Sequence, residues 1–503
     1  MSTYISVSEL IAQAADRYGD KTIYTDFKDT VSFSVANELS SRIACALIER
    51  GLVGRPVLVL SGRNAITPVI YLGVARAGCF YIPVDDSQNC NRINQIIDAT
   101  KPALIIVQKE AERFIYGTEY TGDVITSEEL LMHENDFDLL TRVQDTITTL
   151  SPIYVIYTSG SSGRPKGVMT STGSLINYIE AVNEILKLTP EDVLGNQSPL
   201  DYIASIREIY LPLFTGASTV IIPSPLFAMA ADLAAAIDDN RISVLCWSAS
   251  GLELAARIGL HEEIKTKSIR IVLFSGSVIS GKVLKQWQTA LPEPLFINQY
   301  GSTETTASCT YYVVDSMADD DTVLPIGVPY RNYDVFLIDA DGRKTPCGET
   351  GEICVAGIGV ALGYYRDEEL TTKSFIPDPR CKEGIVYKTG DYGRINKDGN
   401  LEFCGRKDRQ IKFMGHRVEP EEIELCAASI AGVESCLLTK EEDNSRLILY
   451  YEGKAERKEI VLKLRQYLPP YMVPGKIVKI EELPRLPNGK IDEPALKLSR
   501  GKE

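Results

Sequence analysis

The sequence predicts an α/β protein with a large N-terminal domain of doubly wound sheets, a β-rich subdomain, and a small, mobile α+β domain at the C-terminus. Through about residue 300, short β-branched apolar runs alternate with longer amphipathic stretches, and short strands with turn signals follow. The chain has 503 residues. Because a single core stops growing at roughly 250–300 residues, we expect two or more domains.

The apolar runs are near-continuous, as in strands that are buried on both faces of a parallel sheet. They lie at residues 57–60, 103–107, 154–157, 219–222, 244–247 and 269–274, and amphipathic stretches at 65–77, 175–186 and 229–239 separate them. This alternation favours parallel sheets covered by helices, and we expect more than one such sheet.

From about residue 325 to 405, turn signals such as Asp341-Gly342 and Asp398-Gly399 separate short strands, which indicates a β-rich subdomain. Beyond it we expect a helix after Glu419, strands near 433–439 and 446–452, and a helix near 456–467. We therefore divide the chain into an N-terminal domain over residues 1–407 and a C-terminal lid domain over residues 408–503.

The composition excludes several classes of function. The net charge of −15 disfavours a general nucleic-acid binder. With 3 histidines, a histidine-ligated zinc site or a Ser-His-Asp triad is disfavoured. The 11 cysteines show no C-x-x-C spacing and the start lacks a signal-peptide pattern, so we expect reduced thiols and a cytoplasmic protein. No apolar run is long enough to span a membrane.

A glycine-rich segment, YTSGSSGRPKG at residues 157–167, directly follows an apolar run. Its glycines allow close approach to a ligand, its hydroxyls and successive N–H groups can surround an anion, and Lys166 adds a positive charge. The segment suits a triphosphate, although it does not fit the Walker A pattern. The alternative is a flexible surface loop, which Gly/Ser runs also form.

This segment resembles the signature loop of the adenylate-forming superfamily, which includes acyl-CoA synthetases, firefly-type luciferases and nonribosomal-peptide adenylation domains. Further motifs follow in the order of that family: NQYGSTE at 298–304, YKTGD at 387–391, GRKDRQIK at 405–412 with GHRVE at 415–419, and PNGKID at 487–492. The resemblance covers essentially the whole chain. It is strongest to the amino-acid-activating branch, including stand-alone D-alanine–carrier-protein ligases.

The resemblance implies that a carboxylate attacks the α-phosphate of ATP, giving an acyl-adenylate and pyrophosphate, and that a thiol then takes the acyl group. It implies that Lys166 and Thr303 act at the phosphates, and that Glu304 binds Mg²⁺. The residues implied to hold the nucleotide are Thr158, Ser159, Gly160, Ser161, Ser162, Gly163, Gly276, Asn298, Tyr300, Gly301, Asp391 and Arg406. Taken without the other motifs, Tyr300 is read as a core side chain and Asp391 as a turn residue.

Four residues of the C-terminal region have implied roles in the two half-reactions. Lys490 is implied to bridge the attacking carboxylate and the α-phosphate. Asp408 matches the hinge about which the lid rotates. Lys412 and Gly415 lie on the face that is used in the thioester-forming arrangement.

Residues 196–210 resemble the acyl-pocket helix of the family. Ile203 falls where activators of α-amino acids carry an aspartate for the substrate ammonium, and Ser302 falls where they often carry proline. The pocket is expected to be lined by Tyr202, Ile203, Ala204, Arg207, Cys246, Leu273, Ser275, Gln299, Ala307 and Ser308.

Arg207 falls near the pocket floor, and two interpretations stay open. In the first, the substrate lacks an ordinary α-ammonium group and carries an acidic or polar group that pairs with Arg207. In the second, Arg207 pairs with Asp201 or Glu208, and the substrate is a plain acyl or amino acid.

The predicted function is ATP-dependent activation of a carboxylic acid and transfer of the acyl group to the phosphopantetheine thiol of a separate carrier protein. We expect the carrier in trans because no fused carrier region follows the C-terminal domain in this sequence. CoA as the acceptor and amino-acid adenylation are alternatives. Luciferase-like oxidation of the adenylate and a catalytically silent binding protein are remoter ones.

Overall fold

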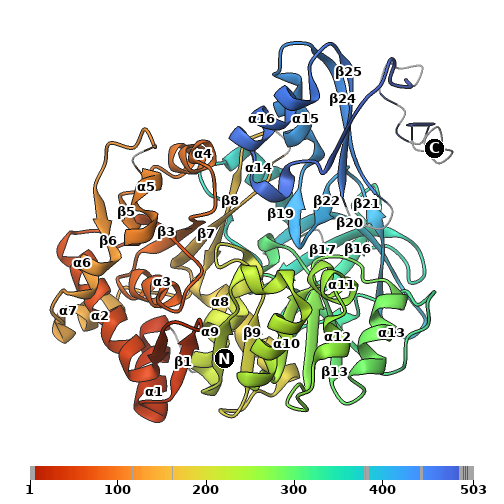
Figure 1. The fold of residues 1–503 in the computed structure, drawn as a ribbon. Helices are drawn as coiled ribbons and strands as arrows, with labels where there is room; N and C mark the ends of the chain where they lie inside the picture. Colours follow the sequence, from red (N-terminus) through yellow and green to blue (C-terminus); the bar gives the residue numbers. More distant parts are fainter. Residues whose placement is uncertain are drawn as a thin grey trace.

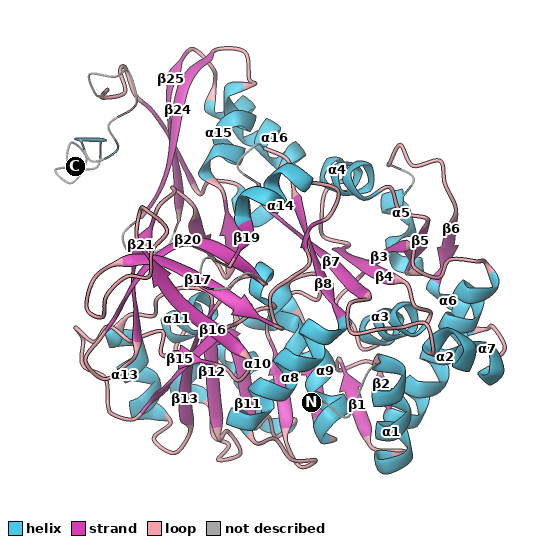
Figure 2. Ribbon diagram, turned by 180° about the vertical axis from the view of Figure 1, so that it is seen from behind, coloured by secondary structure: helices cyan, strands magenta, loops and turns pink. Residues whose placement is uncertain are grey.

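The computed structural model describes residues 6–115, 117–160, 163–378, 380, 384–441, 446–485, 491, 493 and 495–496. Two large sheets and their helices form the body of the molecule, a third sheet lies beside them, and the C-terminal elements stand above (Figures 1 and 2). The predicted fold class is confirmed.

The first large sheet has seven strands in the order β18-β8-β7-β4-β3-β5-β6. Strands β3 to β7 pair in parallel, whereas β8 and β18 add an antiparallel edge. The strands are β3 (Pro56–Ser61), β4 (Phe80–Asp85), β5 (Leu104–Val107), β6 (Val124–Thr126), β7 (Pro152–Thr158), β8 (Lys166–Ser171) and β18 (Gly363–Tyr364). The glycine-rich loop joins β7 to β8, so a buried strand anchors each of its ends.

The second large sheet has nine strands in the order β15-β14-β13-β12-β11-β9-β10-β1-β2. Its central strands β9 to β13 are parallel. The strands are β1 (Thr22–Thr25), β2 (Thr30–Ser32), β9 (Val193–Asn196), β10 (Ser218–Ile221), β11 (Val244–Ser248), β12 (Ile271–Ser275), β13 (Leu295–Tyr300), β14 (Thr310–Val314) and β15 (Val328–Pro329).

Helices α2 (Phe33–Glu49), α3 (Ile66–Arg76), α8 (Thr172–Leu186) and α9 (Ile206–Thr215) share one apolar cluster with strands of both large sheets. Serine side chains begin two of them: Ser32 accepts a hydrogen bond from the backbone of Val35, and Ser171 accepts one from that of Ser174. Such caps satisfy N–H groups that the first helical turn leaves unpaired. A second cluster joins the outer helices α10 (Ala230–Asp239), α11 (Ala249–Arg257) and α13 (Gly281–Ala290) to β11 and β12.

The remaining helices of the N-terminal part lie mostly at the surface of the molecule (Figure 1). They are α1 (Val7–Tyr18), α4 (Cys90–Thr100), α5 (Glu112–Ile115), α6 (Ser127–Leu131), α7 (Phe137–Gln144), α10 (Ala230–Asp239), α11 (Ala249–Arg257), α12 (Leu260–Glu263), α13 (Gly281–Ala290) and α14 (Glu368–Ser374). Within the described ranges, no helix combines the length and the apolar character needed to cross a membrane.

The third sheet is antiparallel and falls in the segment where the sequence predicts a β-rich subdomain. Its strands are β16 (Tyr333–Ile338), β17 (Gly351–Gly357), β19 (Phe375–Pro377), β20 (Ile385–Ile395) and β21 (Leu401–Arg406). Asp391 and Arg406 are register partners on β20 and β21, which places both side chains on the same face of this sheet.

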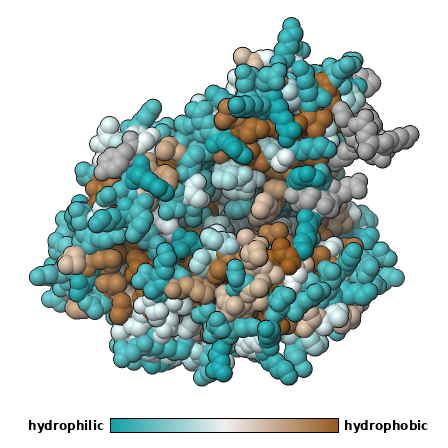
Figure 3. Space-filling view, in the orientation of Figure 1, coloured by the Kyte–Doolittle hydropathy of each residue, from teal (hydrophilic) through white to brown (hydrophobic). Residues whose placement is uncertain are grey.

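The C-terminal part consists of the hairpin β22–β23 and a three-stranded sheet with two helices, packed around a cluster of its own. Its elements are β22 (Ile411–Phe413), β23 (His416–Val418), α15 (Pro420–Ala428), β24 (Val433–Lys440), β25 (Leu447–Gly453), α16 (Arg457–Tyr467) and β26 (Lys476–Lys479). Apolar residues are visible on its surface (Figure 3), and Leu425 on α15 and Leu462 on α16 are exposed.

Candidate active site

Two adjoining cavities lie where the carboxyl ends of β11, β12 and β13 meet the hairpin β22–β23. Parallel strands place their carboxyl ends at one edge of a sheet, which is where ligands of open α/β sheets bind. The first cavity, of about 50 Å³, is lined by Tyr202, Ile203, Ala204, Arg207, Ser248, Ser275, Gly276, Gly301, Ser302, Thr303, Ala307, Tyr387, Thr389, Asp391, Arg406, Gln410, Lys412, Gly415 and Arg417. The second cavity, of about 340 Å³, includes Gly276, Asn298, Gln299, Tyr300, Asp391, Arg406 and Lys412 in its wall.

The glycine-rich loop contacts the C-terminal part. The Ser159 hydroxyl donates to the backbone oxygen of Arg417 at 2.6 Å, and the Gly160 N–H donates to Glu422 at 3.3 Å. The hydroxyl of Thr158 is buried without a hydrogen-bond partner. An unpartnered buried hydroxyl beside backbone N–H groups is suited to a phosphate oxygen.

Two glycines explain the shape of this loop. A side chain at Gly160 would lie 2.2 Å from the backbone oxygen of Arg164, and Gly163 has a φ of +76°. Both positions therefore favour glycine. Ser161 and Ser162, which the sequence predicts to bind phosphate, lie outside the described residues.

Glu304 is fully buried at the centre of a charged cluster. Arg417 Nη1 donates to its two carboxylate oxygens at 2.8 and 3.1 Å, and Tyr364 donates at 2.7 Å. Lys166 Nζ lies 3.9 Å from Glu304 and 3.8 Å from Glu419. Burial alone would raise the pKa of Glu304, but Arg417 and Lys166 hold that pKa well below its usual range.

The Glu304 carboxylate fits Mg²⁺ as a ligand if a bound substrate supplies the remaining oxygen ligands. A single carboxylate suffices when substrate phosphates supply the other oxygen ligands. Among the described residues, no group of three or more His, Cys, Asp or Glu could hold a metal without a substrate. Glu304 is engaged by Arg417 here, so Mg²⁺ fits at this carboxylate only when Arg417 has moved away.

A second polar group borders both cavities. The Tyr300 hydroxyl donates to Asp391 at 2.6 Å, and Arg406 pairs with the other oxygen of Asp391 and with Asp408. Lys412 Nζ lies 5.5 Å from the centre of the Tyr300 ring. This group presents an aromatic ring, a carboxylate and a guanidinium to the second cavity, which suits a base and a ribose.

Asn298 and Gly276 also line the second cavity, and Gly301 lines the first. The amide nitrogen of Asn298 donates to the backbone oxygen of Pro325 at 2.9 Å. Its side-chain oxygen is therefore the group of this amide that remains for a ligand.

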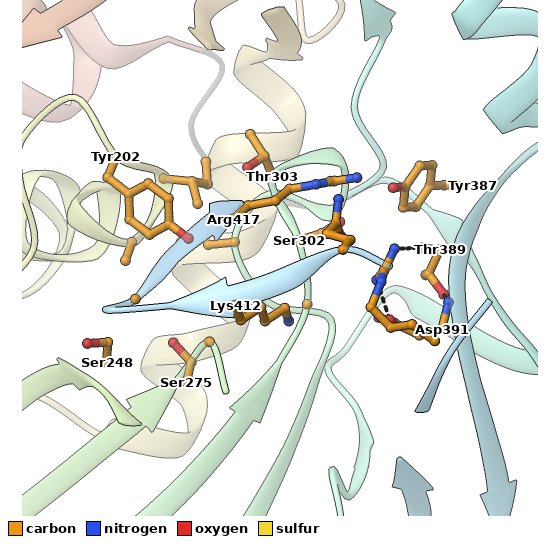
Figure 4. Close-up of a pocket in the computed structure, with 18 of the residues that line it drawn as sticks. Tyr202, Ser248, Ser275, Ser302, Thr303, Tyr387, Thr389, Asp391, Lys412 and Arg417 are labelled. Carbon is orange, nitrogen blue, oxygen red and sulfur yellow. Dashed lines mark hydrogen bonds and ion pairs between the residues drawn. The ribbon is translucent and has the colours of Figure 1, made fainter. Parts of the chain in front are cut away.

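The hairpin β22–β23 crosses the first cavity. Figure 4 shows Lys412 and Arg417 on its strands, with Tyr202 towards one end and Thr389 and Asp391 towards the other. At its turn, Gly415 has a φ of +81°, and a side chain there would lie 2.9 Å from the hydroxyl of Ser248. A larger residue would clash at this point, so the turn requires glycine.

Contacts at the flank of the hairpin fix it against the N-terminal part. His416 stacks on Tyr471 with ring centres 3.8 Å apart and lies 5.2 Å from the ring of Tyr202. Burial lowers the pKa of His416 to about 4, so the ring is neutral near pH 7. Arg92 and Glu422 form a buried ion pair of 2.8 Å across the same boundary.

The acyl-pocket residues predicted from the sequence divide into two groups. Tyr202, Ile203, Ala204, Arg207, Ser275 and Ala307 line the first cavity. Cys246, Leu273 and Ser308 are buried and are not part of its lining, and Gln299 lines the second cavity.

Gln299 also accepts a hydrogen bond from Arg207 Nη1 at 2.5 Å. Of the two acids suggested for Arg207, the structure places Glu208 beside it, whereas the Asp201 carboxylate accepts from the backbone N–H of Asp85. Glu208 is the acid near Arg207, at 4.0 Å from Nε.

Several lining residues were not assigned a role from the sequence. Tyr387, Gln410 and Arg417 fall inside the quoted motifs, which is a signal that could have found them. Thr389 also falls inside a quoted motif, YKTGD at 387–391, whereas Ser248 follows from the tertiary structure alone. Lys490 lies outside the described residues.

The fold and these two cavities define a nucleotide-binding α/β enzyme. Residues 11–365 match a family model described as AMP-binding enzyme. The chain belongs to this family, which confirms the prediction of an adenylate-forming ligase.

The relatives support this assignment. The chain is 30% identical over 515 residues to zwittermicin A synthase ZmaJ of Bacillus cereus, covering 99% of this chain and 95% of that protein. It is 30% identical to tyrocidine synthase 3 of Brevibacillus parabrevis and 31% identical to bacitracin synthase 1 of Bacillus licheniformis, each over 98% of this chain. It spans only 8% and 9% of the length of those two relatives.

Solved structures share the fold. The Vibrio cholerae adenylation domain AlmE, in complex with glycyl-adenosine-5'-phosphate, superposes with a TM-score of 0.85 over 100% of this chain and 99% of its own, at 22% identity. The artificially fused adenylation–PCP di-domain NpsA-ThdA from Klebsiella oxytoca gives 0.82 over 95% and 94%, also at 22% identity.

Proposed function

We propose that the protein activates a carboxylic acid with ATP, releases pyrophosphate, and passes the acyl group to the phosphopantetheine thiol of a separate carrier protein. The observation that carries this proposal is the pair of adjoining cavities. The second is suited to a nucleoside, the first is closed by Arg207 at its floor, and Asp391, Arg406 and Lys412 line both. An acid in the first cavity would therefore meet the α-phosphate of a nucleotide in the second.

In the first half-reaction, a carboxylate oxygen bonds to the α-phosphorus, and the bond from that phosphorus to the pyrophosphate oxygen breaks. No proton has to be removed from the carboxylate, so no general base is needed. The protein supplies positioning and positive charge. Lys166 and Thr303 would hold the phosphates, and Glu304 would hold Mg²⁺, which neutralises phosphate charge when bound.

The hairpin position supports the second half-reaction. With Arg417 on Glu304 and Ser159 bonded to the hairpin backbone, the phosphate end of the site is taken up by protein groups. We therefore propose that the observed arrangement serves thioester formation. Rotation of residues 408–503 about Asp408 would withdraw the hairpin before ATP binds.

The acid is proposed to lack an ordinary α-ammonium group. Ile203 lines the first cavity, and its neighbours Tyr202, Ala204, Ser275 and Ala307 carry no negative charge. A buried ammonium without a counter-charge is costly. The printed description of AlmE names a glycyl-adenylate, so amino-acid activation is the second candidate.

The carrier protein is favoured as the acceptor because one structural neighbour is an adenylation–PCP di-domain. CoA is the alternative. Substrate-dependent ATP–pyrophosphate exchange over a panel of acids tests the first step, and thioester formation with CoA or a carrier protein separates the acceptors. Absence of exchange with every acid would indicate a silent binding protein and would overturn the proposal.

Substitution of Lys490 tests the division of labour between the two steps. We expect Lys490→Ala to abolish exchange and to spare thioester formation from supplied adenylate. The exposed Lys397 offers a matched control, Lys397→Ala, which should retain both steps. Equal loss of both steps in Lys490→Ala would contradict the assignment.

A further inference from the structure

Arg207 is an unusual group for the floor of a small cavity. It lies near the start of α9, and its side chain is 1% exposed although it lines the first cavity beside Ile203 and Ala204. A guanidinium is permanently charged and carries five N–H donors. Burying it is therefore costly unless a counter-charge and acceptors are supplied.

The protein supplies only part of what this guanidinium needs. Nη1 donates to Gln299 Oε1 at 2.5 Å. Nε lies 4.0 Å from Glu208 Oε2, which is too far for a hydrogen bond, and Nε and Nη2 are buried without partners. Unmade hydrogen bonds of a buried charged group indicate a missing acceptor.

The counter-charge that the protein offers to Arg207 is weak as well. Among the described residues, Glu208 is the carboxylate that interacts with Arg207. Glu208 also interacts with Arg63, whose guanidinium donates hydrogen bonds to Asn196. Asn196 donates to the other oxygen of Glu208 at 3.4 Å. Arg63 has a second acidic neighbour in Asp85, so the shortfall is confined to Arg207: Glu208 accepts no hydrogen bond from its Nε and also interacts with Arg63.

We propose that the acid activated by this enzyme carries a second carboxylate, which pairs with Arg207. This inference rests on the proposed adenylation function. One carboxylate of the substrate bonds to the α-phosphorus as pyrophosphate leaves. The other accepts hydrogen bonds from Nε and Nη2 and does not react.

The size and composition of the cavity restrict this substrate further. With the hairpin β22–β23 across it, the cavity measures about 50 Å³, and we infer a short chain from this small volume. Ile203 offers no counter-charge for an ammonium group, so α-amino diacids should be poor substrates. The substrate class is therefore a short dicarboxylic acid without an α-amino group.

The test is ATP–pyrophosphate exchange with malonate, succinate and glutarate, each compared with its half-amide. A half-amide has nearly the same shape as the diacid but lacks the second charge. The wild-type enzyme is expected to favour one diacid over its half-amide by about 100-fold in kcat/KM, since a buried guanidinium that is left unpaired disfavours the neutral analogue. In Arg207→Met, this ratio should fall to about 1.

A second variant tests the same inference in case Arg207→Met does not fold. Gln299→Glu places a carboxylate where Gln299 now accepts from Nη1, which supplies an internal counter-charge. At saturating ATP, it should lower the diacid-to-half-amide ratio of kcat/KM by at least about 10-fold and leave Tm unreduced; the ratio cancels any effect of Gln299 on the nucleotide compartment.

The outcomes separate this inference from the proposed function. A wild-type preference for the half-amide, or for neutral acids over all diacids, overturns the inference and leaves the adenylation function intact. Equal loss of diacid and half-amide exchange in Arg207→Met also overturns it, because a structural role would produce that result. Absence of exchange with every acid overturns both.

Discussion

The contact between Arg417 and Glu304 offers a quantitative test of how the hairpin controls the two half-reactions. Substituting Arg417→Met removes two charge-assisted hydrogen bonds, of 2.8 and 3.1 Å, to a fully buried carboxylate. Each is worth about 1.5 kcal/mol or more, so the observed arrangement loses at least about 3 kcal/mol. Since 1.4 kcal/mol is a factor of ten, its population relative to the open arrangement should fall about 100-fold.

The two steps should respond in opposite directions. Thioester formation from supplied adenylate should slow by up to about 100-fold. The KM for ATP in the exchange assay should decrease, because Arg417 no longer competes for Glu304. Equal loss of both steps, or an unchanged thioester rate, would refute the reasoning.

A second variant distinguishes a population shift from a local effect at Glu304. Arg92 pairs with Glu422 across the same boundary at 2.8 Å, away from Glu304. Arg92→Gln should therefore also slow the thioester step relative to exchange. If Arg417→Met alone shows the split, the effect is local and the population argument fails.

Three further predictions concern single residues of the site. Burial lowers the pKa of Lys166 to about 8, so kcat/KM for ATP should fall as pH rises through about 8, and Lys166→Arg should remove that break. Gly415→Ala should impair thioester formation more than exchange, because its new side chain would lie 2.9 Å from Ser248; equal effects on the two rates would contradict this. Burial raises the pKa of Glu208 to about 7, and above that pH its ionised form competes for Arg207. Diacid exchange should therefore decline as pH rises through about 7, and Glu208→Gln should flatten the profile.

The parallel strands could be predicted because their signal is local. The run at 57–60 lies within β3 and the run at 244–247 within β11, since consecutive apolar side chains are buried on both faces of these strands. Strands β1 and β2 were not predicted. They are short and partly exposed, and so few residues carry no recognisable periodicity.

The site residues that belong to motifs along the chain could be predicted from the sequence. It was harder to predict which pocket residues reach the cavity surface and which are buried behind it. Counting along the sequence identified Cys246 and Leu273 as pocket residues, but both are fully buried and stand outside the cavity lining. A residue's position along the sequence places it on a strand, but it does not show whether another side chain lies between that residue and the cavity. The contact of Arg417 with Glu304 joins residues 113 positions apart and depends on how the C-terminal part docks.

Gln299 has a consequence for any attempt to redesign this enzyme. Its side chain holds Arg207 and the hydroxyl of Tyr330, while the same residue forms part of the wall of the second cavity. Changing it to alter acid selectivity would therefore disturb the nucleotide compartment as well. Ala204 and Ser275 border the first cavity only. Substitutions at those two positions, in evolution or in the laboratory, would therefore change acid selectivity with less effect on nucleotide binding.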